Sequence, residues 1–281
     1  FAGSLLACDM GGGALARQLT DDPQAAALGG VITGSMLGAT VVFTIPVAMG
    51  ILREEDRPVM AKGILCGIVT IPLGVLAGGL TAGFPLPMVL RNLVPIVLIA
   101  LLIALGLWRA ENAMVRGFEA FGKLVVAVAT VGLAAAIGEA LTGYPIIRGM
   151  EPISEGFETV GIIAIVLAGA FPLVFVLTKL LRKPLLAAGG LLGINDAAAA
   201  GLLASLANSI AAFGMVKDMN ERGKVVNIAF AVSGAFVFGD HLGFTAGFAP
   251  EMMGAMIAGK LVGGLTAIAA AWILTRKSEK A

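Results

Sequence analysis

Long apolar blocks, separated by short charged stretches, dominate the chain. A helix needs about 20 apolar residues to cross the hydrocarbon core of a bilayer, within a range of roughly 17 to 25. Counted with their flanking residues, seven blocks fit such spans. The pattern therefore predicts an all-α, polytopic bundle of transmembrane helices. The blocks are residues 23–52, 63–90, 92–108, 124–138, 159–178, 225–239 and 252–275.

The region from residue 184 to 216 does not fit a single span. It contains two apolar parts, 184–195 and 197–216, and the first is too short to cross a bilayer alone. The polar sequence at 193–196 lies between them and is typical of a helix break. We expect a re-entrant or discontinuous helix pair here, in addition to the seven spans. A single crossing is the alternative.

The basic residues favour the re-entrant pair. If residues 184–216 return to the side from which they start, every Lys and Arg lies in loops on one side except Arg17, Arg91, Arg148 and Lys260. Positively charged loops stay in the cytoplasm. This arrangement predicts a multi-pass protein of the inner (plasma) membrane with a cytoplasmic C-terminus. A single crossing would instead move several of the basic residues outside.

The composition excludes several classes of protein. The chain has 281 residues, of which 58% are apolar and 13% charged, whereas soluble domains are about 25% charged. A net charge of +1 gives no reason to expect a nucleic-acid partner. With one histidine, two isolated cysteines (Cys8 and Cys66) and no phosphate-binding or nucleophile motif, neither an enzyme nor a cofactor or metal site is predicted. The lipid bilayer is the expected surrounding, and a homo-oligomer is compatible with the pattern.

Two parts of the chain resemble each other. Repeated units with broken helices are typical of transporters. We predict repeat copies at 1–52 and 232–275, in a single membrane domain (1–281) that lacks its first spans, because the chain starts inside an apolar stretch. The predicted topology favours a parallel over an inverted repeat, and chance similarity of glycine-rich helices is the alternative. The matched positions are Gly3, Asp9 and Gly12 with Gly234, Asp240 and Gly243 (offset 231), and Gly29, Ile32, Gly34 and Gly38 with Gly254, Ile257, Gly259 and Gly263 (offset 225).

Acidic residues beside glycines are the candidate binding groups. Asp240 and His241 end an apolar helix, and Asp9 precedes three glycines. Because a buried carboxylate is costly without a partner, these side chains are expected to face a cavity or a ligand. There Asp240 and Asp9 could offset a cation, and His241 could titrate near neutral pH. A capping role at the water interface is the alternative for each.

Four further polar residues complete the predicted binding set. Asn195 and Asp196 stand at the predicted break, with helix capping by Asp196 as the alternative. Asn208 follows three helical turns later and could share their face. Lys260 lies about 12 Å along the last apolar helix, so pairing with a carboxylate such as Asp240 is favoured over snorkelling.

Residues 238–247 have the sequence Phe-Gly-Asp-His-Leu-Gly-Phe-Thr-Ala-Gly, and Met-Ile-Ala-Gly-Lys-Leu follows at 256–261. Together they resemble the ethanolamine permease (EutH) family, and the regions around Asp9 and 193–196 are similar to it as well. The resemblance implies an inner-membrane protein that admits ethanolamine for cytoplasmic breakdown. Ethanolamine is a small ammonium with one hydroxyl, which a carboxylate and an Asn or Thr side chain could bind. An ion-coupled carrier of another small metabolite is the alternative.

Overall fold

Helices form the fold throughout the part of the chain that the computed structural model describes, residues 12–150 and 152–278. No strand occurs among these residues, and the all-α prediction is confirmed. The α-helices are α2 (Gly12–Leu19), α3 (Pro23–Ala27), α4 (Ile45–Ile51), α5 (Arg57–Thr81), α6 (Leu86–Thr142), α7 (Ile153–Leu192), α8 (Asp196–Ala207), α9 (Ser209–Met215), α10 (Glu221–Gly234), α11 (Asp240–Phe248) and α12 (Met253–Ser278). Two π-helices, η2 (Leu28–Gly38) and η3 (Thr40–Thr44), join α3 to α4, and short 3-10 turns lie at η4 (Glu54–Asp56), η5 (Val216–Asp218) and η6 (Pro250–Met252).

Five helical segments among the described residues are long and apolar enough to cross a membrane. They are Pro23–Ile51, Glu54–Thr81, Leu86–Ala110, Ile153–Ala170 and Pro250–Arg276. The chain is accordingly a multi-pass helical membrane protein. Two predicted spans are not among these five segments. The span at 124–138 corresponds to the shorter apolar helix Val126–Thr142, and the span at 225–239 extends beyond the end of α10 at Gly234. The count of seven spans therefore stays a prediction.

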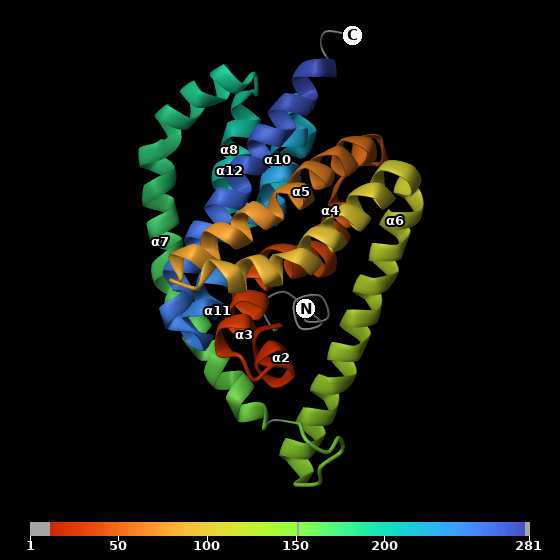
Figure 1. The fold of residues 1–281 in the computed structure, drawn as a ribbon, viewed down its shortest axis with the longest axis vertical. Coiled ribbons are helices and arrows are strands. Elements are labelled where there is room, and N and C mark those ends of the chain that lie inside the picture. Colours follow the sequence, from red (N-terminus) through yellow and green to blue (C-terminus); the bar gives the residue numbers. More distant parts are fainter. Residues whose placement is uncertain (1–11, 151, 279–281) are drawn as a thin grey trace.

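The predicted block 63–90 is not one helix. Helix α5 ends at Thr81, and Gly83 adopts a left-handed conformation with φ +74°, which glycine tolerates because it has no Cβ. Helix α6 then begins at Leu86 and is kinked at Ala110, where φ is −146° and ψ is 50°. The kink separates the predicted blocks 92–108 and 124–138, and α6 changes direction there (Figure 1).

Helix α5 is the centre of the packing and contacts both α10 and α12. Gly67 of α5 lies against Val232 of α10, and Gly74 lies against the backbone of Gly259 of α12. Small residues let two helix backbones approach closely, and such packing replaces the hydrophobic driving force that is weak between helices in lipid. The many glycines therefore allow close contacts between helices in addition to breaks within them.

Replacing Gly67 with alanine is expected to destabilise the bundle. A Cβ at this position would collide with the side chain of Val232 and lie 2.8 Å from the carbonyl oxygen of Ala229. Helices α5 and α10 would have to separate, which costs about 1–3 kcal/mol. Gly254→Ala is the matched control, because its Cβ would meet nothing within 4 Å. Thermal unfolding in detergent should show a lower Tm for Gly67→Ala only, and equal Tm values would contradict this packing.

Helices α8 and α9 form a hairpin that returns to its starting point. Asn195 precedes α8, and its Nδ2 donates to the carbonyl oxygen of Asp218, just beyond α9, at 2.8 Å. Asn208 interrupts the helix at the tip, with φ −158° and ψ 121°. The predicted break at 193–196 is present, and the helices on its two sides form a bent pair, Leu186–Leu192 and Asp196–Ala207. That this pair is re-entrant stays a prediction. Residues 184–192 continue α7, which ends at Gly193 (φ +71°) before a bend of 118° into α8.

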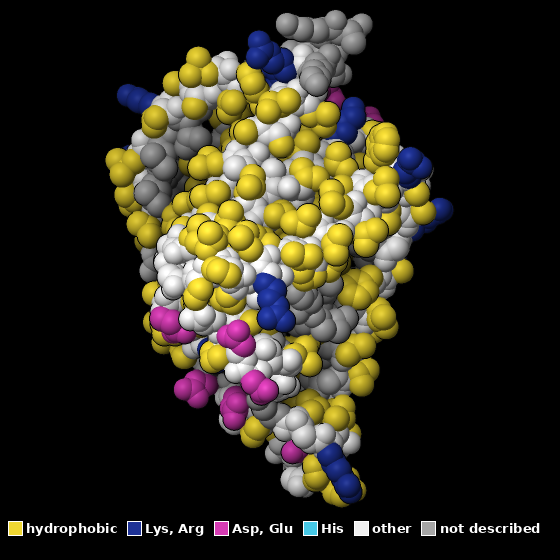
Figure 2. All heavy atoms as spheres, in the orientation of Figure 1, with side chains coloured by type: hydrophobic (Ala, Val, Ile, Leu, Met, Phe, Trp, Pro, Cys, Tyr) yellow, Lys and Arg dark blue, Asp and Glu magenta, His cyan; other side chains and the backbone are white. Residues whose placement is uncertain are grey.

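The two ends of the bundle differ in charge. The C-terminus and the labels of α8 and α10 lie towards the top of Figure 1, whereas α2, α3 and α11 lie in its lower half. Lys and Arg side chains are found mainly towards the upper end in Figure 2, and Asp and Glu gather in the lower half. This asymmetry is of the kind that the positive-inside rule describes, and the cytoplasmic position of the basic end stays a prediction.

Two hydrogen bonds join positions that the predicted repeat makes equivalent. Arg17 Nη2 donates to the carbonyl oxygen of Phe248 across 231 residues, and Lys260 Nζ donates to the carbonyl oxygen of Ser35 across 225 residues. These separations are the two offsets of the repeat. Equivalent positions meet where related units pack about a local two-fold axis. The repeat itself, with copies at 1–52 and 232–275, stays a prediction.

Candidate functional site

A break between α10 and α11 forms one half of the candidate site. The backbone is unwound before Asp240, and Phe236 has φ +61°, which is uncommon for any residue except glycine. The backbone N–H groups of Phe236 and Phe238 donate to the carbonyl oxygens of Ser205 and Leu206, both at 2.9 Å. The unwound segment therefore bonds to the last turn of α8, as backbone away from water must find partners within the protein.

The tip of the α8–α9 hairpin forms the other half. Asn208 caps α9 by accepting a hydrogen bond from the backbone N–H of Ile210 at 2.8 Å. Gly239 packs directly on the carbonyl oxygen of Ala207, where a Cβ would collide. We call residues 205–209 and 235–241 the tip–break junction. Ends of α8, α9, α10 and α11 meet there, although these helices are formed by separate parts of the chain.

The tip–break junction brings together three of the predicted binding residues: Asn208, Asp240 and His241. Asp240 is exposed at the first position of α11, and His241 beside it is buried. The His241 ring lies 5.3 Å from the ring of Phe236, which contacts the Phe43 ring edge-on at 5.5 Å. A carboxylate beside aromatic rings and helix C-terminal ends suits a small cation.

Asn195 and Asp196 lie at the base of the hairpin instead of at its tip. Asn195 caps α8 by accepting from the backbone N–H of Ala198 at 3.2 Å, and Asp196 is exposed in the first turn. Asn208 follows the last residue of α8, so 12 residues, about 18 Å of helix, separate it from Asp196; that they share a face stays a prediction. A shared site of Asp196 and Asp240 has no support in this geometry.

Lys260 is buried and bonds to the helical segment η2. Its side chain is 1% exposed, which excludes snorkelling, and Nζ donates to the carbonyl oxygen of Ser35 at 2.6 Å. Ser35 belongs to the π-helix η2, so Lys260 links α12 to this wide helical segment. Pairing of Lys260 with Asp240 stays a prediction. Asp9 lies outside the described residues.

Sequence reasoning left two serines of the junction out of the binding set. Ser205 and Ser209 flank Asn208, are fully buried, and their hydroxyl oxygens have no hydrogen-bond partner among the described residues. Two serines within four residues of Asn208, inside an apolar block, are the only sequence signal for this polar cluster. In the sequence, only the glycines near Phe236 indicate that the helix unwinds there.

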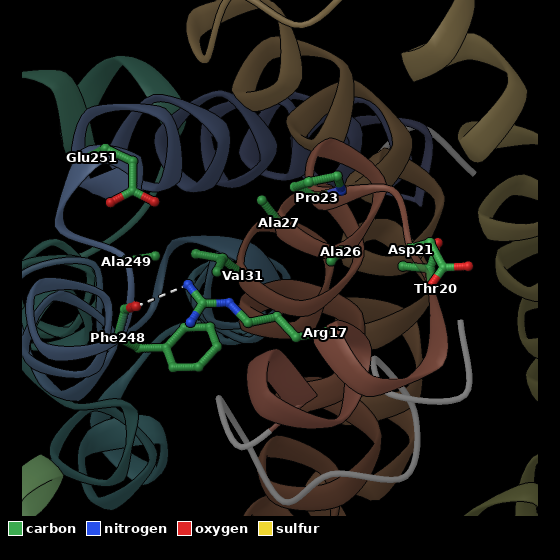
Figure 3. A pocket seen from close by; sticks show the side chains of 10 residues that line it. All are labelled: Arg17, Thr20, Asp21, Pro23, Ala26, Ala27, Val31, Phe248, Ala249 and Glu251. Atoms are coloured by element: carbon green, nitrogen blue, oxygen red, sulfur yellow. Dashed lines mark hydrogen bonds between the residues drawn. The ribbon is translucent and has the colours of Figure 1, made fainter.

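Cavities open at the far end of α11. One cavity of about 380 Å³ lies between α2, α3 and α11 and is lined by Asp21 and Glu251 (Figure 3). Within it, the Arg17 guanidinium lies 3.8 Å from the ring centroid of Phe248 and donates to the carbonyl oxygen of Phe248 at 3.1 Å. A second cavity of about 750 Å³ shares Arg17 and Phe248 and extends to Glu155. Helix α11 therefore connects the junction with an acidic, hollowed end of the molecule.

At the basic end, an ion pair joins Asp56 of η4 to Lys224 of α10. Lys224 Nζ lies 2.7 Å from Asp56 Oδ1 and 2.8 Å from Glu221 Oε1, and the Asp56 side chain is only 4% exposed. The hydrogen bonds from Asp56 and then Glu221 raise the pKa of Lys224, which precedes the predicted span 225–239, above its usual 10.5. Neither of the two cavities is lined by these residues.

Comparison with known proteins gives the family. A family model described as "Ethanolamine utilisation protein, EutH" matches residues 1–274. A protein of Listeria monocytogenes named "Probable ethanolamine permease EutH" is 58% identical over 280 residues, covering all of this chain and 75% of the relative. The protein of the same name from Salmonella typhimurium is 47% identical over 305 residues, which cover 100% of this chain and 75% of the relative. An "Uncharacterized protein YxeR" of Bacillus subtilis is 52% identical over 281 residues, which cover 100% of this chain and 76% of the relative.

No solved structure is significantly similar to the chain. The assignment consequently rests on the sequence matches, which extend through every helix described above. They include the junction residues on both the hairpin and the broken helix. The chain belongs to the EutH family of ethanolamine utilisation proteins.

Proposed function

We propose that this protein takes up ethanolamine across the inner membrane and that Asp240 binds the ammonium group at the tip–break junction. Relatives that cover the whole chain are named probable ethanolamine permeases. The observation that carries the proposal is the docking of the hairpin tip on the unwound segment before Asp240. Broken helices in transporters bind substrates where unwound backbone and helix ends are available.

The junction offers a small ammonium ion the full negative charge of Asp240. The partial negative charge at the C-terminal ends of α8 and α10 is balanced by the partial positive charge at the N-terminal ends of α9 and α11, so Asp240 carries the attraction. Gly239 lets the unwound segment pack directly on the carbonyl oxygen of Ala207, which holds the two halves of the junction together.

The entry route runs from the acidic end to the basic end. The cavities that contain Asp21, Glu251 and Glu155 attract a cation before it reaches α11. The Asp56–Lys224 pair closes the opposite end, which we assign to the cytoplasm together with the C-terminus. The conformation is then outward-facing, and release requires this pair to separate.

Uptake of radiolabelled ethanolamine into proteoliposomes tests the function. The purified protein should accumulate or equilibrate ethanolamine faster than protein-free vesicles, and unlabelled ethanolamine should compete. Choline, with a bulky trimethylammonium group, should compete less well. Uptake no faster than in empty vesicles, with correctly inserted protein, would contradict the proposal.

A second candidate is an ion-coupled carrier of another small metabolite. The buried ammonium group of Lys260 favours it, because ionisable groups inside membrane proteins often take part in ion coupling. Imposed pH and Na⁺ gradients distinguish the two versions. Ethanolamine uptake that follows a gradient supports coupling, whereas uptake that ignores both gradients supports facilitated diffusion.

A further inference from the structure

Two buried hydroxyl groups at the tip–break junction lack the bonds that such groups normally make. Ser205 and Ser209 are both 0% exposed, and neither Oγ has a hydrogen-bond partner in the described part of the chain. Buried polar groups in folded proteins are nearly always hydrogen-bonded, and an exception calls for a functional explanation. A ligand that donates or accepts a hydrogen bond would supply the missing partner.

Other buried hydroxyls in the same bundle bond back to their own helix. Thr40 donates to Met36 at 2.6 Å, and Thr245 donates to His241 at 2.7 Å, in each case to the carbonyl oxygen four residues earlier. Ser205 has a full helical turn before it but makes no such bond. Of the buried hydroxyls in the described helices, Thr40 and Thr245 are therefore bonded, whereas those of Ser205, Ser209 and Ser233 are not.

The two serines lie on the hairpin half of the junction, and Asp240 lies on the other half. The carbonyl oxygen of Ser205 accepts from the backbone N–H of Phe236, and Ser209 follows Asn208 directly at the tip. The broken helix therefore contributes a carboxylate to the junction, and the hairpin contributes two hydroxyl groups without partners among the described residues. A small molecule that carries both an ammonium group and a hydroxyl group offers a partner to each.

We infer that Ser205 and Ser209 determine specificity by binding the hydroxyl group of a small amino alcohol whose ammonium group is held by Asp240. The inference rests on the proposed function. It adds the residues by which the protein would distinguish ethanolamine from alkylamines that lack a hydroxyl group. A site built to hydrogen-bond a substrate hydroxyl discriminates against an analogue without it, because the analogue leaves the protein groups unbonded. Ethylamine, which lacks only the hydroxyl, is the appropriate comparison.

Ser233 provides the matched control. It is equally buried and its hydroxyl also lacks a partner among the described residues. However, it faces α12, where a Cβ added to Gly263 would lie 3.0 Å from Ser233 Oγ. The same substitution at this position therefore removes a similar hydroxyl without touching the junction.

The experiment compares the two amines as competitors of labelled ethanolamine uptake in proteoliposomes. Wild type should prefer ethanolamine over ethylamine. Ser205→Ala and Ser209→Ala should each weaken inhibition by ethanolamine about threefold to tenfold, with inhibition by ethylamine unchanged. Ser233→Ala should keep the wild-type preference. Ligand-induced shifts in Tm of the purified variants give the same comparison where uptake is too slow to measure.

The results separate this inference from the proposed function. If wild type neither transports nor binds ethanolamine, the proposed function fails. If it transports ethanolamine without preferring it to ethylamine, or if both junction variants keep the preference, the assignment of the serines is overturned and the function stands. An equal loss of preference in Ser233→Ala also overturns it. Both junction variants should fold, because each removes only an unbonded oxygen atom.

Discussion

Replacing Asp240 with asparagine is expected to reduce ethanolamine uptake about 10-fold to 100-fold at substrate concentrations below KM. The substitution keeps the shape of the side chain but removes its negative charge. A hydrogen bond to a charged group contributes about 1.5–3 kcal/mol, and each 1.4 kcal/mol corresponds to about a tenfold change in affinity. Because Asp240 is exposed at the start of α11, the variant should still fold and insert. Initial uptake rates at several ethanolamine concentrations give the change in KM.

Asp196→Asn is the matched control for Asp240→Asn. Asp196 is also exposed in the first turn of a helix, but it lies at the base of the hairpin. Its replacement should leave uptake within about twofold of wild type, since isolated surface substitutions have small effects. Asp240→Glu should recover part of the activity, because it restores the charge with a longer side chain. Equal uptake by Asp240→Asn and wild type would exclude Asp240 as the ammonium site.

Breaking the Asp56–Lys224 pair is expected to open the basic end of the transporter. Asp56→Asn leaves the Lys224 ammonium in a mostly buried position without its 2.7 Å partner. Loss of one member of a fully buried pair costs about 3–5 kcal/mol; the cost here is smaller, because Lys224 is 14% exposed and keeps Glu221 at 2.8 Å, and it falls on the conformation in which the end is closed. We expect lower uptake and faster reaction of a cysteine at Asn220, beside the pair, with a membrane-impermeant thiol reagent applied from the cytoplasmic side.

Glu221→Gln is the control, because Glu221 also contacts Lys224 but its side chain is 74% exposed. Exposed pairs contribute about 0–1 kcal/mol, so this variant should behave as wild type. The exchanged pair Asp56→Lys with Lys224→Asp should restore closure in part. If Asp56→Asn and Glu221→Gln have the same small effect, the pair does not close this end.

The pKa of Lys224 adds an expectation for pH. Its hydrogen bonds to Asp56 and Glu221 raise the pKa above 10.5. When the folded state raises the pKa of a lysine, its ion pair stabilises the closed end fully at any pH below the pKa of that lysine in the unfolded chain. The stabilisation is lost only as the pH rises through the higher pKa of the folded state. Between neutral pH and about pH 9, deprotonation of Lys224 should therefore contribute no change in uptake. Strong pH dependence in that range would have to arise from another group.

The sequence was sufficient to predict the class of fold. Apolar block lengths predict membrane helices, and the distribution of Lys and Arg predicts that residues 184–216 do not cross. The contact of Asn195 with Asp218 at the base of the hairpin agrees with this prediction. The predicted break at 193–196 has a physical cause, because Gly193 ends α7 and turns the chain into α8.

The candidate site could be predicted only in part. Asp240 and His241 were accessible to sequence reasoning, because charged residues are rare in apolar segments. Asn208 was included in the predicted set, but its place at the hairpin tip was not predicted, since a helical pattern continues through it. The meeting of Ser205 with Phe236 joins residues from separate helices. Such contacts depend on tertiary packing, which periodicity within one helix does not encode.

Protection of a cysteine at position 208 tests the central claim most directly. In a variant without Cys8 and Cys66, Asn208→Cys would be labelled by a thiol-reactive ammonium reagent, with Asn195→Cys at the hairpin base as the control. We predict that ethanolamine slows labelling at position 208 and leaves labelling at position 195 unchanged. If ethanolamine protects neither position, or only position 195, while the protein still transports it, the amine does not bind at the tip–break junction.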